Sequence, residues 1–309
     1  MTAFPSSSTD SSVATRAPPA PSGYRPAALF RALGGYLLLL PAAALMALVL
    51  LYPIVGSIIN SVTQDGRFIG TESFRTVFSD PVFWQSFKNN LILLVSIPVR
   101  LVLGLAIVAV LYRGIYGSRL YQLLVFLPFI PSIAAIGVVF IYLLNFSGPF
   151  NEFLRVAGLG FLAHGWLTEE NLSMWTIMAV VVWTRLGFTV LLLMARLLTV
   201  DRSIFQAAFI DGASWPRAFW HVGIPQLRGT IEFIVILSFI EAFSWSFAYI
   251  YVLTQGANNP SQWILEVFLY NKEFLTFSTG LASAVAVVLL LMAGAIALYR
   301  YRRFRLEAA

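Results

Sequence analysis

The sequence contains no cysteine, which excludes disulfide bonds, zinc–thiolate sites and catalysis by a thiol. Its two histidines, His164 and His221, lie on opposite sides of a membrane in the topology expected below, so they cannot share a metal ion. The H-E-x-x-H and G-x-S-x-G patterns of zinc proteases and serine hydrolases are also missing. We therefore predict no metal site, no catalytic residue and no enzyme.

Lysine is almost as scarce. Lys88 follows Phe87 and Lys272 follows Asn271, and there is no other lysine. A phosphate-binding P-loop requires a lysine directly after a glycine. The chain therefore has no P-loop of its own.

Charge is scarce throughout. Charged residues make up 11% of the chain and hydrophobic residues 59%, with a mean hydropathy of +0.82. Soluble domains carry about 25% charged residues, so this composition predicts an all-α integral membrane protein. Six apolar runs reach the roughly 20 residues that a helix needs to cross a bilayer. These predicted transmembrane helices lie near 34–59, 87–112, 119–145, 172–198, 228–252 and 275–299.

The basic residues predict how the spans are oriented. If both termini are cytoplasmic, thirteen arginines fall in inside segments, whereas five basic residues fall outside and Arg100 and Arg185 lie within spans. This bias fits the positive-inside rule. The net charge of +6 is thus explained by topology, and no nucleic-acid partner is expected.

The chain is expected to form one membrane domain with a tail. Residues 1–30 begin with a segment rich in serine, threonine and proline, which predicts a disordered cytoplasmic tail. Residues 31–309 form the six-span domain, whose first span is expected to be retained as a signal anchor. In the external segment 60–86, Phe74, Val77 and Phe78 have helical spacing and predict a short surface helix.

One loop combines glycines and prolines that break helices with charged residues. It is the segment QAAFIDGASWPRAFWHVGIP at 206–225, which lies in the loop at about 199–227 between the predicted spans four and five. Asp201 is a candidate N-cap for a first helix that ends at Gly212. Ser214 is a candidate cap for a second helix, ended by Gly223 and Pro225. A DNA-binding helix-turn-helix is disfavoured because both flanks enter predicted spans within a few residues. A plain surface helix and a docking element both remain open on these residues.

The same segment resembles the EAA motif of the permease subunits of ABC importers. Ala207, Ala208 and Gly212 match that motif, and Val222-Gly223-Ile224-Pro225 closes it. Gln206 stands where the family usually has glutamate, and Ile224 where it has leucine. Asp211-Gly212-Ala213 is similar to the form common in carbohydrate permeases. The stretches FIGTESFRTVFSDPVFW, LLVFLPFIPS and FSWSFAYIYVLTQG also resemble the maltose-like and glycerol-phosphate-like type, and occur in the same order.

The resemblance implies a function in transport. The 199–227 loop would be a coupling helix that docks on a separate ATPase, which would hold the ATP and magnesium, so no cofactor is expected in this chain. The expected partners are a second homologous permease, two ATPase subunits, an external solute-binding protein and the bilayer of a bacterial inner membrane. The solute would be a sugar or sugar-like compound. The coupling contacts implied by the motif are Gln206, Ala207, Ala208, Asp211, Gly212, Ala213 and Pro225.

Charged residues inside the predicted spans are candidates for the solute path. Arg100, Arg185 and Glu241 fall at similar depths, and charges at that depth usually face a cavity or a partner. They either line the path or form an ion pair that holds helices together, and the two roles are compatible. The remaining path candidates are Ser238 and Trp245, placed on the Glu241 face by i, i+3, i+7 spacing, with Ser244, Tyr142 and Asn145.

Two other functions remain as alternatives. A permease for a non-sugar solute would carry the same loop, because the loop reports the ATPase contact rather than the solute. A stand-alone secondary transporter is less favoured, because such proteins normally contain internal repeats and no clear repeat is present.

Overall fold

A computed structural model of the chain describes residues 39–64 and 66–308. The predicted tail, residues 1–30, lies outside the described residues. Two compact units are present, one ending at Ile54 and the other running from Val55 to Ala309. The described part of the first unit is helical from Leu39 and includes the π-turn η1 (Ala47–Leu51).

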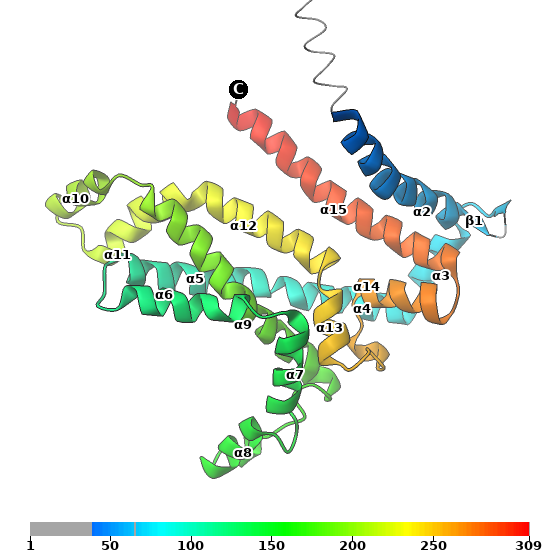
Figure 1. The fold of residues 1–309 in the computed structure, drawn as a ribbon, viewed down its shortest axis with the longest axis horizontal. Coiled ribbons are helices and arrows are strands. Elements are labelled where there is room, and N and C mark those ends of the chain that lie inside the picture. The colour runs from blue at the N-terminus through cyan, green and yellow to red at the C-terminus, as the bar shows by residue number, and fades with distance from the viewer. Residues whose placement is uncertain (1–38, 65, 309) are drawn as a thin grey trace, which may run out of the picture. The chain divides into compact units, whose positions relative to one another are not determined.

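The second unit is built almost entirely of helices. In chain order its elements are α2 (Tyr52–Val62, which begins in the first unit), β1 (Thr63–Gln64), β2 (Arg67–Phe68), α3 (Glu72–Ser79), α4 (Pro81–Leu94), α5 (Ser96–Tyr112), α6 (Ser118–Phe126), η2 (Leu127–Phe129), α7 (Ile133–Leu143), α8 (Pro149–Val156), η3 (Gly160–Leu162), α9 (Glu170–Leu198), α10 (Arg202–Ile210), α11 (Trp215–Ala218), η4 (Phe219–Gly223), α12 (Ile224–Ser244), α13 (Phe247–Leu253), η5 (Pro260–Gln262), α14 (Leu265–Tyr270), η6 (Asn271–Leu275) and α15 (Thr279–Ala308). Within this unit, α10 and α11 lie at one end and α3 with the β1–β2 hairpin at the other (Figure 1).

Three helices among the described residues are long and apolar enough to cross a membrane unbroken: Leu39–Val62, Pro81–Tyr112 and Glu170–Leu198. Two bent pairs raise the number to five if each pair is one span. The apolar part of α15, Thr279–Ala295, is shorter than these spans. The expectation of a helical membrane protein is therefore confirmed, whereas the expectation of six spans stays a prediction.

The first of the two bent pairs has a local cause. The first, Ser118–Phe129 with Ile133–Leu143, turns by 92° at Pro131 and Ser132. Proline cannot donate the helical hydrogen bond, and Ser132 starts the next helix by accepting from the N–H of Ala135 at 3.3 Å. The second, Trp215–Ser244 with Phe247–Leu253, turns by 53°.

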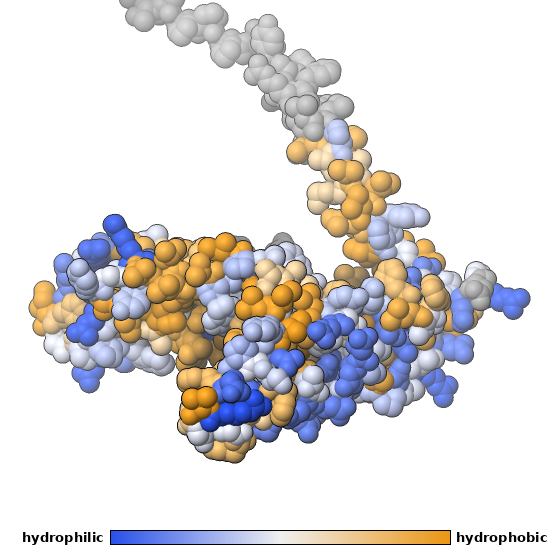
Figure 2. Space-filling model, turned by 60° about the horizontal axis from the view of Figure 1, so that its bottom comes forward, coloured by the Kyte–Doolittle hydropathy of each residue, from blue (hydrophilic) through white to orange (hydrophobic). Residues whose placement is uncertain are grey.

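The core consists of two hydrophobic clusters joined by α9. One cluster contains Ile177 of α9 with Phe243, Ile250 and Phe268, and the other contains Leu193 of α9 with Val108, Phe205 and Leu227. Helix α9 packs most extensively on α5, where Gly104 lets the two helices approach closely. In the view of Figure 2, hydrophobic residues gather in the half of this unit nearer α10 and α11, whereas hydrophilic residues cover much of the other half and part of the central projection. That distribution suits a protein surrounded by lipid.

The predicted surface helix at Phe74–Phe78 is present as α3, but its apolar set is only partly buried. Val77 is buried, whereas Phe78 is 43% exposed and packs edge-on against Phe83 at 5.3 Å. The ring of Phe78 covers the start of α4, so this side chain packs on the next helix rather than beneath α3.

Candidate functional site

The 199–227 loop begins with the capped helix that the sequence predicts. Asp201 precedes α10, and its carboxylate accepts from the N–H of Ser203 at 2.9 Å. Hydrogen bonds from the backbone of Ser203, and then from its hydroxyl, lower the pKa of Asp201. At the other end, Gly212 adopts φ +81°, and the N–H of Ala213 returns to the carbonyl of Ala208 at 2.9 Å. A glycine in this left-handed conformation is the usual way to end a helix.

The second half of the loop differs from the prediction. Ser214 occupies the N-cap position of α11, but its side chain makes no capping bond. Gly223 and Pro225 do not end this helix, because Trp215–Ser244 runs as one helix through the π-turn η4. In that wider turn the N–H of Ile224 bonds to the carbonyl of Phe219, and Pro225 falls at the start of α12, where its missing N–H is tolerated.

An aromatic anchor, which the motif does not reveal, fastens the loop to the membrane helices. The indole N–H of Trp215 donates to the carbonyl of Ala109 at 3.1 Å, and its ring stacks on Tyr112 and Phe205 at 6.0 and 5.8 Å. Because Ala109 and Tyr112 belong to α5, a force on the loop is passed directly to that helix.

The outer face of the loop is exposed and carries both polar and apolar residues. Gln206, Ala207, Asp211, Gly212 and Pro225 are exposed, and Ala208 and Ala213 are half-buried. Beside them the apolar side chain of Ile210 is 86% exposed. Exposed apolar side chains on a short, fastened helix suit a protein contact.

The three charged candidates meet inside the membrane helices. Glu241 of α12 lies between two arginines: its Oε2 is 3.7 Å from Nη1 of Arg100 in α5, and its Oε1 is 3.4 Å from Nη1 of Arg185 in α9. The side chains of Arg100, Arg185 and Glu241 are 4%, 14% and 19% exposed. One carboxylate therefore faces two cations, and we call these residues the charge cluster.

Aromatic rings surround the less buried arginine. The guanidinium of Arg185 is 5.8 Å from the ring centre of Phe129 and 5.9 Å from that of Tyr249. The hydroxyl of Tyr249 is 3.1 Å from that of Thr184 on α9, which fixes the ring. Phe129 and Tyr249 were not predicted, because no sequence spacing connects them to α9.

The other path candidates are spread out. Ser238 is buried one turn before Glu241 on α12. Trp245 is exposed and caps the end of α12 with φ −130°, and its N–H still bonds to the carbonyl of Glu241 at 3.0 Å, so its place on the Glu241 face stays a prediction. Asn145 lines a separate cavity of 290 Å³ between the end of α7 and residues 253–262, and its side chain accepts from the N–H of Ser147 at 3.1 Å. Tyr142 is 71% exposed and is not among the residues that line that cavity.

Comparison with known proteins establishes the family. Residues 101–306 match the family described as the inner-membrane component of binding-protein-dependent transport systems. The chain belongs to this family. It is a permease subunit of an ABC importer and not an enzyme, and the ATPase of such a transporter is a separate chain.

Relatives of this permease match over nearly their whole length. The lactose transport system permease protein LacF of Rhizobium radiobacter is 32% identical over 277 residues, which cover 86% of this chain and 92% of LacF. The sn-glycerol-3-phosphate transport system permease protein UgpA of Yersinia enterocolitica is 28% identical over 277 residues, covering 86% and 92%. A crystal structure of a bacterial ABC transporter that imports the acidic polysaccharide alginate shares the fold, with a TM-score of 0.78 and 21% identity over 90% of this chain and 97% of that one.

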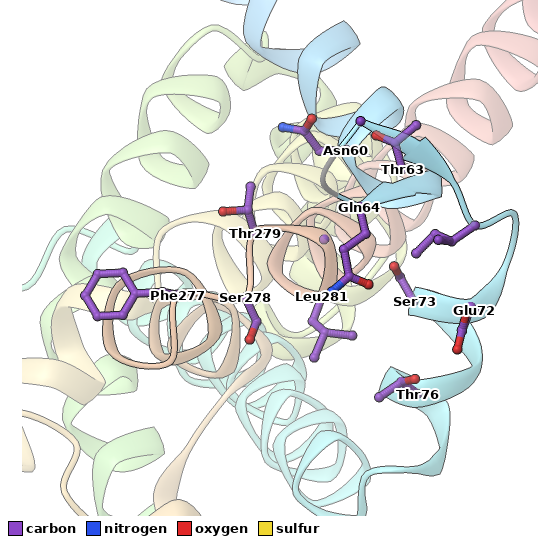
Figure 3. Close-up of a pocket in the computed structure, with 13 residues that line it drawn as sticks. Asn60, Thr63, Gln64, Glu72, Ser73, Thr76, Phe277, Ser278, Thr279 and Leu281 are labelled. Carbon is purple, nitrogen blue, oxygen red and sulfur yellow. The ribbon is translucent and has the colours of Figure 1, made fainter.

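The permease also has a polar pocket that the sequence does not predict. It measures 420 Å³ and lies between the end of α2, the β1–β2 hairpin, α3 and the start of α15. Gln64, Glu72, Ser73 and Thr76 line one side, and Ser278 and Thr279 the other (Figure 3). These residues come from elements other than α5, α9 and α12, so the pocket is separate from the charge cluster.

Proposed function

We propose that this permease pairs with a second homologous permease and imports a sugar or sugar-like solute across a bacterial inner membrane. An external solute-binding protein delivers the solute, and two ATPase subunits dock on the 199–227 loop. Both termini face the cytoplasm. The proposal is supported by relatives named for lactose and sn-glycerol-3-phosphate, and by a structural neighbour solved with an alginate-bound periplasmic protein.

The charge cluster is the observation that carries the proposed solute path. Fully buried ion pairs only hold helices together, whereas Arg185 and Glu241 retain some exposure next to two aromatic rings. A guanidinium and a carboxylate offer donors and acceptors to solute hydroxyls, and an aromatic ring offers a face for stacking. The cluster carries one more positive than negative charge, which also accommodates an acidic solute. A permease for a non-sugar solute remains the second candidate.

Reconstitution tests this function. The chain should co-purify with an ATPase and a second permease, and ATP hydrolysis by the complex should rise when the loaded binding protein is added. The panel should contain lactose, sn-glycerol 3-phosphate and alginate oligosaccharides, with the solute-free binding protein as control. Transport by the chain alone in liposomes without ATP would contradict the proposal.

We expect replacement of Gly212 by leucine to separate ATP hydrolysis from uptake. Nothing lies within 4 Å of a Cβ at this position, so the cost comes from holding φ +81° with an L side chain, about 1–2 kcal/mol. The turn after α10 should change shape, and the loop should transmit less of the ATPase motion. Uptake per ATP hydrolysed should therefore fall several-fold in proteoliposomes.

Gly229 provides the matched control for this substitution. It is also exposed with open space around it, but it lies within α12 and has no positive φ. Gly229→Leu should leave the ratio of uptake to hydrolysis unchanged. If Gly212→Leu keeps normal coupling, the loop is not the docking element.

A further inference from the structure

The break between α12 and α13 replaces one backbone hydrogen bond by two side-chain contacts. In an unbroken helix the N–H of Ser246 would bond to the carbonyl of Ala242. Instead, this N–H donates to Oε1 of Glu266, on α14, at 3.3 Å. The carbonyl of Ala242 accepts from Nδ2 of Asn90, on α4, at 2.9 Å. Both ends of the missing bond are thus satisfied from other helices.

The two side chains are themselves connected. Oδ1 of Asn90 accepts from the N–H of Leu265 at 2.9 Å, and Leu265 directly precedes Glu266. Asn90 is fully buried, and Oε2 of Glu266 is buried without a hydrogen-bond partner. A polar backbone group left unpaired in such surroundings is costly, so removing either side chain should let the break change shape. We call Asn90 and Glu266 the clamp.

The clamp acts next to the charge cluster. Glu241 directly precedes Ala242, and its carbonyl accepts from the N–H of Trp245 at 3.0 Å and from the hydroxyl of Ser246 at 3.2 Å. Both residues held by the clamp, Ala242 and Ser246, therefore border the backbone of Glu241. We propose that Asn90 and Glu266 are positioning residues that hold the last turn of α12 and keep the Glu241 carboxylate between Arg100 and Arg185. This inference rests on the proposed role of Glu241 in the solute path.

Burial favours the neutral form of the Glu266 carboxyl. Glu266 lies outside the candidate spans, and burial raises its pKa to about 8 despite hydrogen bonds from the backbone of Ser246 and Phe247. Within the described part of the chain it makes no ion pair. The titratable side chains of α4, α12, α13 and η6, which pack on α14, include Lys88, Arg228, Glu232, Glu241, Tyr249, Tyr251, Lys272 and Glu273, and α14 itself holds Tyr270. Of these, Glu241 is engaged by the arginines and Lys272 by Asp80 at 3.0 Å.

This pKa predicts a pH dependence of stability. The folded chain binds the Glu266 proton more tightly than the unfolded chain does, so the stabilisation is complete below the ordinary glutamate pKa and is lost as pH rises through about 8. The thermal unfolding midpoint of the purified complex should therefore fall between about pH 5 and pH 9. Glu266→Gln, which cannot ionise, should flatten that fall. An equally steep fall in the variant would contradict a buried neutral carboxyl.

The absence of cysteine makes the clamp directly testable. Ser244→Cys places a single thiol at the end of α12, and its rate of reaction with N-ethylmaleimide at pH 7 reports the shape of the break in the reconstituted complex. Asn90→Ala and Glu266→Ala should each change this rate by about fivefold or more, because each leaves a backbone group unpaired. Glu266→Gln keeps an acceptor for Ser246 and should retain the parent rate.

Asn89 is the matched control. It is a buried amide on the same helix, and it donates to the carbonyls of Ser261 and Trp263 at 2.8 and 2.7 Å without touching the break. Asn89→Ala should leave the labelling rate unchanged. An equal change in Asn89→Ala and Asn90→Ala would overturn the inference, because it would mean a general loss of packing. If the alanine variants do not assemble, Asn90→Asp, which loses the donor to Ala242, should still shift the rate.

A double-mutant cycle tests whether the clamp acts through Glu241. In a background that carries Arg100→Gln together with Glu241→Gln, which removes the carboxylate along with one of its buried partners, Asn90→Asp should change the labelling rate less than in the parent, because the two sites share the last turn of α12. Strictly additive effects would refute the positioning role. The labelling test requires no solute, so its result is independent of uptake. If the labelling rates contradict the clamp but Glu241 is needed for uptake, only the positioning role is wrong. If the labelling rates support the clamp but Glu241 is not needed for uptake, only the proposed solute path is wrong.

Discussion

Replacing Gly187 by alanine is expected to prevent the permease from assembling. A Cβ at this position of α9 would lie 2.5 Å from the carbonyl oxygen of Val125 and 2.8 Å from Cα of Phe126. Both are backbone atoms at the end of α6, so no rotamer change can relieve the contact. Forcing extra atoms into a packed core typically costs about 1–3 kcal/mol, and a backbone clash belongs at or above the upper end. The yield of monodisperse protein in detergent and its unfolding midpoint should both drop.

Two other glycines calibrate this result. At Gly104 the nearest atom is a methyl carbon of the Thr189 side chain at 2.9 Å, so Gly104→Ala should cost less than Gly187→Ala. Gly294, in α15, has open space around it, and Gly294→Ala should be harmless. If all three variants behave alike, the close approach of α9 to the end of α6 does not limit stability.

Replacing Glu241 by glutamine is expected to damage assembly as well as uptake. Glu241 is the one carboxylate that ion-pairs with Arg100 and Arg185 among the described residues, so the variant leaves two buried cations facing each other. Removing one partner of a buried ion pair typically costs about 3–5 kcal/mol. The yield of the complex and its uptake should therefore fall together.

Arg185→Gln separates structure from transport. It leaves the Arg100–Glu241 pair intact and electrically neutral, so the complex should assemble at normal yield while uptake falls at least about tenfold, from the loss of a charged hydrogen-bonding group. The double variant Arg100→Gln with Glu241→Gln should recover assembly better than Glu241→Gln alone. Normal uptake by an assembled Arg185→Gln complex would reduce the charge cluster to a purely structural role.

Local signals predicted the first half of the loop well and the second half poorly. Asp201 and Gly212 act within their own turns, by a side-chain cap and a positive φ, so their effects can be read from neighbouring residues. Gly223 and Pro225 resemble residues that end a helix. The helix nevertheless continues past them through the π-turn η4, and Phe219 and Leu227 on either side are buried in the core. Packing over a long helix outweighs a local terminator.

The charge cluster likewise combines a feature that the sequence predicts with one that depends on packing between distant helices. The sequence placed three charges at similar depth and left open which arginine pairs with the glutamate. The answer, that both do, depends on how α5, α9 and α12 pack. The break after α12 is held by Asn90 and Glu266, about 150 residues before it and 20 after it, and no helical spacing includes such contacts.

By itself, the sequence determined that this chain lives in a membrane, that it has no P-loop, and that it carries the loop of a permease family. Those properties follow from hydropathy, from missing residue types and from a short motif. Only the tertiary structure decided where the helix breaks between α12 and α13 and which charges share a partner. In a membrane interior each polar group must find a bond within the protein, and which group supplies it is settled by helices that are distant in the chain.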